Sequence, residues 1–214
     1  PIYGIAAMKA SAGWLEPVNL AQLLPKGGGV KSVFMYPCER NRDGYYYLEN
    51  PNRPGERFWF WYQSDVQPNP FMNYAGAGGR GLHIEHDDAG AAGSTPLQQR
   101  VNNHYIWEMV EADGRYDLKD GRSTGSPSQV WPGTSNNRTF NAFSIPYARW
   151  WDQTDCGLRI HDVILPTDPL APIEVRFEYF DPLIPWVWPA DGADLDNDGI
   201  PDVWEYHYFG GITV

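Results

Sequence analysis

The stretch Gly44–Gln63, with the sequence GYYYLENPNRPGERFWFWYQ, decides the fold class. Its first six and its last seven residues are dense in aromatic and β-forming side chains, which favours a strand at each end. Between them lies Pro51–Gly55 (PNRPG), which has the composition of a turn. The stretch therefore predicts two strands joined by a turn.

The rest of the chain offers more strands and few helices. With 22 glycines and 19 prolines among 214 residues, turns must be frequent and long helices scarce. We predict an all-β fold, namely a β-sandwich of the jelly-roll or immunoglobulin-like type with long loops. The other predicted strands are Val30–Tyr36, Gly81–Glu85, Tyr105–Glu111, Gly157–Leu165 and Ile173–Tyr179.

A short helix is predicted near the start of the chain, where Ile5, Met8 and Ala12 would share one face and Gly13 ends the pattern. Near the other end, the Pro- and Trp-rich segment Asp181–Ala190 has the composition of a linker. The predicted organisation is a lead-in over residues 1–25, a sandwich domain over 26–180, and a linker with a tail over 181–214.

The tail contains the sequence DLDNDGIPDVWE at residues 194–205, which fits a twelve-residue calcium loop. Gly199 at the sixth position permits the sharp turn, and Glu205 at the twelfth can close the site with both oxygens. A solvated acidic tail would explain the charge but not this spacing. The predicted Ca²⁺ ligands are Asp194, Asp196, Asp198, the backbone carbonyl of Ile200, Asp202 and Glu205.

No helical pattern precedes Asp194, so the loop is not one hand of a paired helix–loop–helix sensor. A short helix is predicted after Pro201, ending at Gly210. The loop resembles those of thrombospondin type-3 and dockerin-like repeats, and this resemblance implies a structural staple rather than a signalling site.

Charge and cysteine content limit the cellular setting. A net charge of −11 disfavours binding to phosphate backbones and suits a secreted or cell-surface protein that meets divalent cations. The chain begins at Pro1, as a mature product or a piece of a longer protein would, and it has no apolar run of the ~20 residues that span a bilayer.

The chain contains two cysteines. Cys38 and Cys156 could form one disulfide or remain as two buried thiols.

Seven blocks, spread in order over residues 7–165, share a pattern with a known family. They are Ala7–Pro17 (AMKASAGWLEP), Tyr46–Asn50 (YYLEN), Gly81–Asp88 (GLHIEHDD), Glu111–Gly114 (EADG) with Asp117-Leu118, Trp131–Gly133 (WPG), Phe143–Pro146 (FSIP) and Cys156–Ile160 (CGLRI). Together they resemble the region that follows the catalytic core in secreted zinc metallopeptidases of the immune inhibitor A type. In the third block, Glu85 replaces the family's usual Trp, and the WPG block lacks the Asp that normally precedes it.

The zinc signature of that family, His-Glu-x-x-His, is absent, because none of the five histidines is followed by Glu. No other catalytic motif stands in its place. The resemblance therefore implies a non-catalytic accessory domain, with the catalytic unit or other domains of the same precursor as its partners. The alternative is a non-enzymatic extracellular module for adhesion, carbohydrate binding or surface assembly.

Two further features each admit two interpretations. One is a set of acidic residues with one histidine, which could form a second metal site or consist of a structural histidine beside solvated acidic loops. The residues of this possible second metal site are His86, Asp87, Asp88, Glu111, Asp113 and Asp117.

The other feature is the pair of aromatic stretches Phe58–Tyr62 and Trp186–Trp188. They could be core and loop packing, or a platform on which sugars stack.

Overall fold

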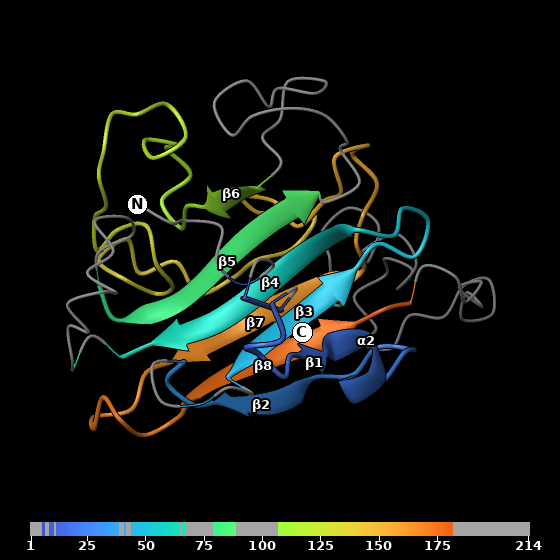
Figure 1. The fold of residues 1–214 in the computed structure, drawn as a ribbon, viewed down its shortest axis with the longest axis horizontal. Helices are drawn as coiled ribbons and strands as arrows, with labels where there is room; N and C mark the ends of the chain where they lie inside the picture. Colours follow the sequence, from blue (N-terminus) through green and yellow to red (C-terminus); the bar gives the residue numbers. More distant parts are fainter. Residues whose placement is uncertain are drawn as a thin grey trace, which may run out of the picture. The chain divides into compact units, whose positions relative to one another are not determined.

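The computed structural model describes residues 6, 9–10, 12–38, 41, 44–64, 66, 79–88 and 107–181. Strands predominate in this part and helix is scarce, so the all-β prediction is confirmed. Figure 1 labels the elements β1 (Val18–Asn19), α2 (Leu20–Leu23), β2 (Lys31–Met35), β3 (Tyr45–Glu49), β4 (Glu56–Gln63), β5 (Gly81–Asp88), β6 (Trp107–Val110), β7 (Leu158–Ile164) and β8 (Ile173–Tyr179).

The predicted pair of aromatic strands forms the centre of the larger sheet. Strands β3 and β4 run antiparallel, with Tyr45 opposite Trp61 and Glu49 opposite Arg57. The connecting turn is closed by backbone hydrogen bonds, in which the N–H of Arg53 donates to the carbonyl of Asn50 and the N–H of Glu56 donates to the carbonyl of Arg53. This hairpin confirms the prediction made from the stretch between residues 44 and 63.

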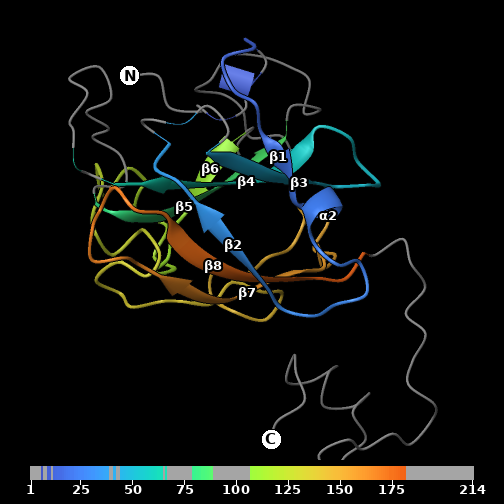
Figure 2. The ribbon, with the colours of Figure 1, turned by 90° about the horizontal axis from the view of Figure 1, so that it is seen from below.

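Within the described residues the strands form two sheets, which Figure 2 shows as separate layers. The larger sheet has the order β1-β3-β4-β5-β6, and the smaller has the order β2-β8-β7. All pairings within these sheets are antiparallel except that of β1 with β3. We refer to these two layers together as the two-sheet domain.

Alternate residues of β4 fill the space between the sheets. Phe58, Phe60 and Tyr62 are buried in one continuous apolar cluster to which both sheets contribute. Phe60 meets Phe177 of β8 edge to face, with ring centroids 5.7 Å apart. Burying a side chain of this size contributes about 1.5–3 kcal/mol, so this alternation is a main source of cohesion between the sheets.

The other face of the larger sheet is covered as well. Trp59 and Tyr45 form a second apolar cluster with Ala6, against which Ala10 and Leu15 pack. Trp59 is therefore core rather than an exposed stacking platform. The covering segment begins in a short helix, since Ala6, Lys9 and Ala10 are helical.

This N-terminal helix ends where the sequence predicted. Gly13 has a positive φ of 71°, and its N–H donates to the carbonyl of Ala10 while that of Trp14 donates to the carbonyl of Lys9. These two bonds are those of a Schellman C-cap, which requires a left-handed residue at the position of Gly13.

Two predicted boundaries differ from the structure. The lead-in is not separate from the domain, because Val18 pairs with Tyr46 while Leu20 and Leu24 belong to the core. Strand β5 also continues to Asp88, beyond its predicted end at Glu85. It does so because Glu56, Arg57 and Phe58 of β4 supply partners for these last residues.

The two cysteines are present as thiols, so no disulfide joins Cys38 to Cys156. Cys156 belongs to the core between the sheets, whereas Cys38 packs against the second cluster on the other side of the larger sheet. Burial raises the pKa of the Cys156 thiol well above its ordinary value, which makes it unreactive. Of the two thiols, Cys156 is buried and Cys38 is only partly buried.

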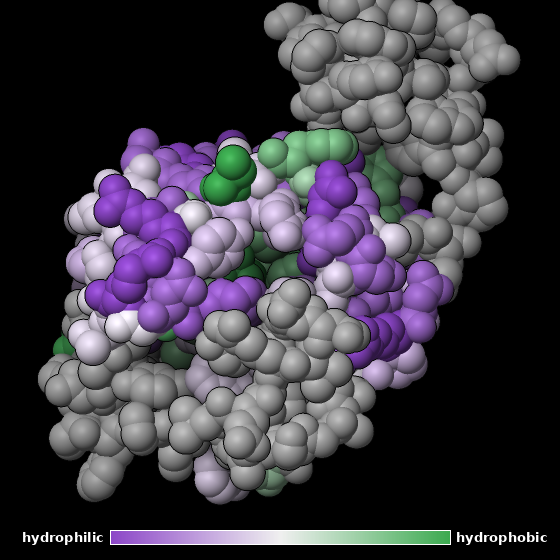
Figure 3. All heavy atoms as spheres, turned by 90° about the horizontal axis from the view of Figure 1, so that it is seen from above, coloured by the Kyte–Doolittle hydropathy of each residue, from purple (hydrophilic) through white to green (hydrophobic). Residues whose placement is uncertain are grey.

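One face of the described residues is largely hydrophilic (Figure 3). In Figure 3, hydrophobic residues gather on this face in a few places and inside a hollow. In the described part of the chain, no helix has the length and apolar character needed to cross a membrane. The chain divides into units 1–181 and 182–214, and the second unit lies outside the described residues.

Candidate functional site

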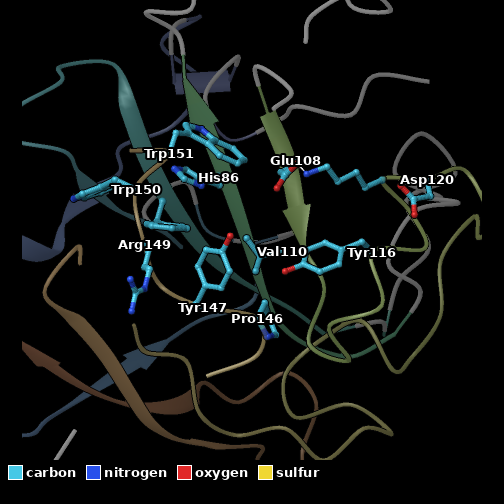
Figure 4. Close-up of a pocket in the computed structure, with 12 residues that line it drawn as sticks. His86, Glu108, Val110, Tyr116, Asp120, Pro146, Tyr147, Arg149, Trp150 and Trp151 are labelled. Carbon is cyan, nitrogen blue, oxygen red and sulfur yellow. Dashed lines mark ion pairs between the residues drawn. The ribbon is translucent and has the colours of Figure 1, made fainter. Parts of the chain in front are cut away.

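A pocket of about 310 Å³ opens where β5 and β6 meet two loops. Strand pairing places His86 directly opposite Glu108, and both side chains line the pocket together with Val110 of β6. Figure 4 shows aromatic rings on several sides of it, with the carboxylate of Glu108 directed inward. The lining residues are Phe58, His86, Glu108, Val110, Tyr116, Lys119, Asp120, Pro146, Tyr147, Arg149, Trp150 and Trp151.

A stack of rings forms one wall of the pocket. The imidazole of His86 lies between Phe58 and Trp151, with centroid distances of 4.1 Å and 4.2 Å. Trp150 stacks on Phe58 at 5.2 Å. The two tryptophans belong to the segment that precedes β7, so the stack fixes this segment to the larger sheet.

Glu56 anchors the same segment from inside the protein. Its Oε1 accepts the backbone N–H of Trp151 at 2.6 Å and lies 3.1 Å from Nε2 of His86. Its Oε2 accepts the side-chain amide of Asn50 at 2.8 Å. Burial alone would raise the pKa of Glu56, but the hydrogen bonds from His86, Trp151 and Asn50 outweigh burial and hold the pKa below its ordinary value.

Glu111 anchors the second loop of the pocket. Its carboxylate accepts the backbone N–H groups of Asp117 and Leu118 at 2.9 Å and 2.8 Å, and the side-chain amide of Gln129 at 2.7 Å. Burial raises the pKa of Glu111 despite these bonds. This long loop is therefore held by a buried side chain of the protein itself.

The mouth of the pocket carries one close ion pair. Nζ of Lys119 lies 2.8 Å from Oε2 of Glu108. The same ammonium lies 5.7 Å from the ring centroid of Tyr116 and 5.8 Å from that of Trp151, within the range of cation–π attraction. An acidic group and two aromatic rings thus surround the Lys119 ammonium.

The opposite face of β5 carries buried polar residues that do not line the pocket. His83 stacks on Trp61 at 5.5 Å, and burial lowers its pKa to about 4 despite a hydrogen bond with the backbone of Gly79. Asp87 accepts the indole N–H of Trp59 at 2.8 Å, and burial raises its pKa to about 7. His83 and His86 therefore face opposite sides of the strand, as residues three apart in a strand must.

Each residue of the possible second metal site has a partner within the protein. His86 contacts Glu56, Asp87 accepts from Trp59, and Glu111 accepts from its own loop. No group of three or more His, Cys, Asp or Glu side chains in the described ranges is arranged to hold a metal ion. The remaining pairs are Asp88 with Arg53 at 2.6 Å, Asp113 with Ser128 at 2.6 Å, and Asp117 with Arg122 at 2.7 Å.

The structure brings together residues that the sequence did not single out. The pocket depends on Glu56, Lys119, Tyr147 and Trp151, none of which belongs to a recognisable motif. A usable signal was the aromatic cluster YARWW at 147–151, which lies outside every predicted strand. The predicted calcium loop, residues 194–205, and the pair Trp186 and Trp188 lie outside the described residues.

Comparison of the chain with known protein families, curated proteins and solved structures finds no match. The resemblance to the peptidase region therefore rests on the seven sequence blocks alone. The chemistry of the pocket follows from its own residues.

Proposed function

We propose that this chain is a non-catalytic accessory domain of an extracellular protein, and that its pocket holds a small ligand. The pocket itself supports this. Its volume of about 310 Å³ suits a ligand the size of one sugar ring or one side chain, at the small end of the range for ligand sites. Its walls are loops held by the buried carboxylates of Glu56 and Glu111, and loops on a rigid scaffold are the usual carriers of binding residues.

The lining favours binding over catalysis. Its described residues include no serine, threonine or cysteine that could serve as a nucleophile. Among the acid–base candidates of the lining, His86 is engaged at Nε2 by Glu56 and covered on its faces by two rings, and Glu108 is paired with Lys119. These contacts favour a structural role for His86, which is one of the two interpretations made from the sequence.

The proposed setting is a secreted metallopeptidase-like protein, with the two sheets forming a β-sandwich of the jelly-roll or immunoglobulin-like type. The net charge of −11, the calcium-loop pattern and the seven blocks support this setting. The alternative is an adhesion, carbohydrate-binding or surface-assembly module, which the aromatic lining of the pocket also favours. Finding His-Glu-x-x-His in the same precursor would support the peptidase setting, and a complete precursor without it would exclude that setting.

Binding in the pocket can be tested with a panel of small probes. We expect the full chain to bind at least one of glucose, N-acetylglucosamine, choline and an N-acetylated lysine amide, measured by titration calorimetry and tryptophan fluorescence. Replacing the half-exposed Tyr147 with alanine should weaken that binding about tenfold, because one aromatic contact contributes up to about 1.5 kcal/mol.

Tyr36→Ala is the matched control, because Tyr36 is also exposed and does not line the pocket. Its binding constants should equal those of the wild type. A panel in which no probe binds would contradict the proposed function, as would probes that bind Tyr147→Ala as tightly as the wild type.

Calcium is predicted to bind residues 194–205 and to protect the tail from proteolysis. A ligand held only by the folded state stabilises the unit that unfolds with it by about 2.7 kcal/mol at a hundred times its dissociation constant. Titration calorimetry should show binding that Asp196→Ala combined with Glu205→Ala abolishes. Asp191→Ala, just outside the twelve-residue pattern, should leave binding unchanged, and equal binding by all three proteins would refute the site.

A further inference from the structure

The ammonium of Lys119 occupies a setting that resembles a binding site for an organic cation. Two aromatic rings, Tyr116 and Trp151, lie within 6 Å of it, and the Glu108 carboxylate lies 2.8 Å away. Tyr147 and Trp150 complete the aromatic lining of the same pocket. Aromatic faces combined with a carboxylate attract ammonium groups, since the ring faces carry negative potential.

The charges around the pocket favour a cation over an anion. Burial raises the pKa of the Tyr116 hydroxyl, and the nearby Tyr147, Glu108 and Glu111 raise it further. Arg149 keeps its positive charge, but hydrogen bonds to the carbonyls of Ala142 and Gln153 hold its guanidinium in place at the edge of the pocket. Figure 4 shows this side chain directed away from Glu108.

The side chain of Lys119 can leave the pocket without disturbing the loop. Its backbone N–H donates to Glu111, and the N–H of Asp120 donates to the carbonyl of Tyr116, so the main chain is fixed independently. The side chain of Lys119 is 24% exposed, and that of Glu108 is 11% exposed. A flexible four-carbon stem at the mouth of a pocket can rotate into solvent while the carboxylate stays in place.

We propose that the pocket is a receptor for an organic ammonium ion, and that Lys119 occupies it as an internal substitute when no ligand is bound. This inference rests on the proposed function, for which it names the ligand class. The ligand is either a small quaternary amine or the lysine side chain of a peptide, because both present an ammonium group. Lys119 competes with the ligand and lowers its apparent affinity.

The test measures binding of three probes to the full chain by titration calorimetry and tryptophan fluorescence. The probes are choline, an N-acetylated lysine amide, and 3,3-dimethyl-1-butanol, which is the uncharged isostere of choline. The wild type should bind at least one ammonium probe and not the butanol. Lys119→Met should raise the affinity for that probe about tenfold, because the Lys119 ammonium no longer competes with the probe for the ion pair and the cation–π contacts.

Adding Glu108→Gln to Lys119→Met should lower the affinity again by about tenfold or more. The matched controls are Lys26→Met, which removes an exposed lysine of the Lys26–Asp181 pair, and Glu174→Gln, which removes a partly exposed carboxylate of β8. Both should bind as the wild type does. Choline binding alone would identify the quaternary source, and binding of the lysine amide alone would identify the peptide source.

If the wild type binds choline and the uncharged isostere equally well, the inference is wrong, and no variant is needed to show it. An unchanged affinity in Lys119→Met would overturn it as well. If only a sugar binds, and Tyr147→Ala weakens that binding, the proposed binding domain stands while the ammonium site is wrong. If no probe binds at all, both proposals fail.

Discussion

Replacing Glu56 with alanine should lower the free energy of unfolding by about 4 kcal/mol. The substitution removes the acceptor for the Trp151 N–H, the His86 imidazole and the Asn50 amide, all at the buried base of the pocket. Each buried donor left without an acceptor costs about 1–3 kcal/mol, and the costs are not fully additive. Urea unfolding followed by tryptophan fluorescence measures the change.

The matched control for this prediction is Glu49→Ala in the neighbouring strand β3. Like Glu56, Glu49 accepts hydrogen bonds from a side chain and from a backbone N–H, here those of Arg57 and Gly55. Its side chain, however, is 34% exposed. Its loss should cost no more than about 1 kcal/mol because exposed ion pairs contribute little. Equal destabilisation by the two variants would show that Glu56 is not an anchor.

Glu56 also predicts a pH dependence. Its pKa is lowered in the folded state, so its contribution is present above the unfolded value near 4.5 and is lost as the pH falls through the lower folded value. Glu56→Ala should therefore lose less stability than the wild type on acidification below about pH 4.5. Parallel acid profiles of the two proteins would contradict this.

The sequence predicted the strands well because their signals are local. The alternation in Phe58–Tyr62 sets which rings face the second sheet, and the turn residues between Asn50 and Glu56 set the hairpin. The sequence could not show that Trp59 is covered. The covering residues Ala6 and Leu15 lie more than forty positions away in the sequence, and nothing in their apolar side chains indicates that they pack on Trp59.

The pocket was missed for the same reason. Glu56 follows a turn and has the appearance of a solvated carboxylate, yet its partners lie 30 and 95 positions away in the sequence. Trp150 and Trp151 lie in an irregular segment without periodicity, so no rule of spacing could place them on the sheet. Long-range contacts of this kind become visible only after the chain has folded.

Replacing Asp87 with asparagine should stabilise the protein at pH 8 by up to about 4 kcal/mol. Burial raises the pKa of Asp87 from 3.8 to about 7, so above pH 7 the fold must hold a buried charge. The folded and unfolded pKa values differ by about three units, and each unit corresponds to about 1.4 kcal/mol of stability lost above pH 7. Asparagine removes that charge, while its side-chain oxygen can still accept the indole N–H of Trp59.

The extra stability of Asp87→Asn over the wild type should disappear as the pH falls. Between pH 7 and pH 4 the folded protein binds a proton at Asp87 that the unfolded chain does not, so the contribution of Asp87 to stability improves as the pH falls. The difference between the two proteins should shrink by about 1.4 kcal/mol per pH unit and approach zero near pH 4. A difference that stays constant with pH would show that Asp87 does not titrate in this range.

The pH dependence of Asp87 must be measured by comparing variants, because His83 changes the stability of the wild type with pH in the opposite direction. Burial lowers its pKa from 6.5 to about 4, so its contribution to stability is lost as the pH falls from 6.5 towards 4. Over this window the slopes of His83 and Asp87 oppose each other, and the wild-type profile should be nearly flat. His83→Gln should uncover the Asp87 slope, with stability rising on acidification, whereas His83→Gln combined with Asp87→Asn should remove both slopes. Two buried groups on one face of β5 would thereby hold stability constant across mildly acidic pH, although each is individually pH-sensitive.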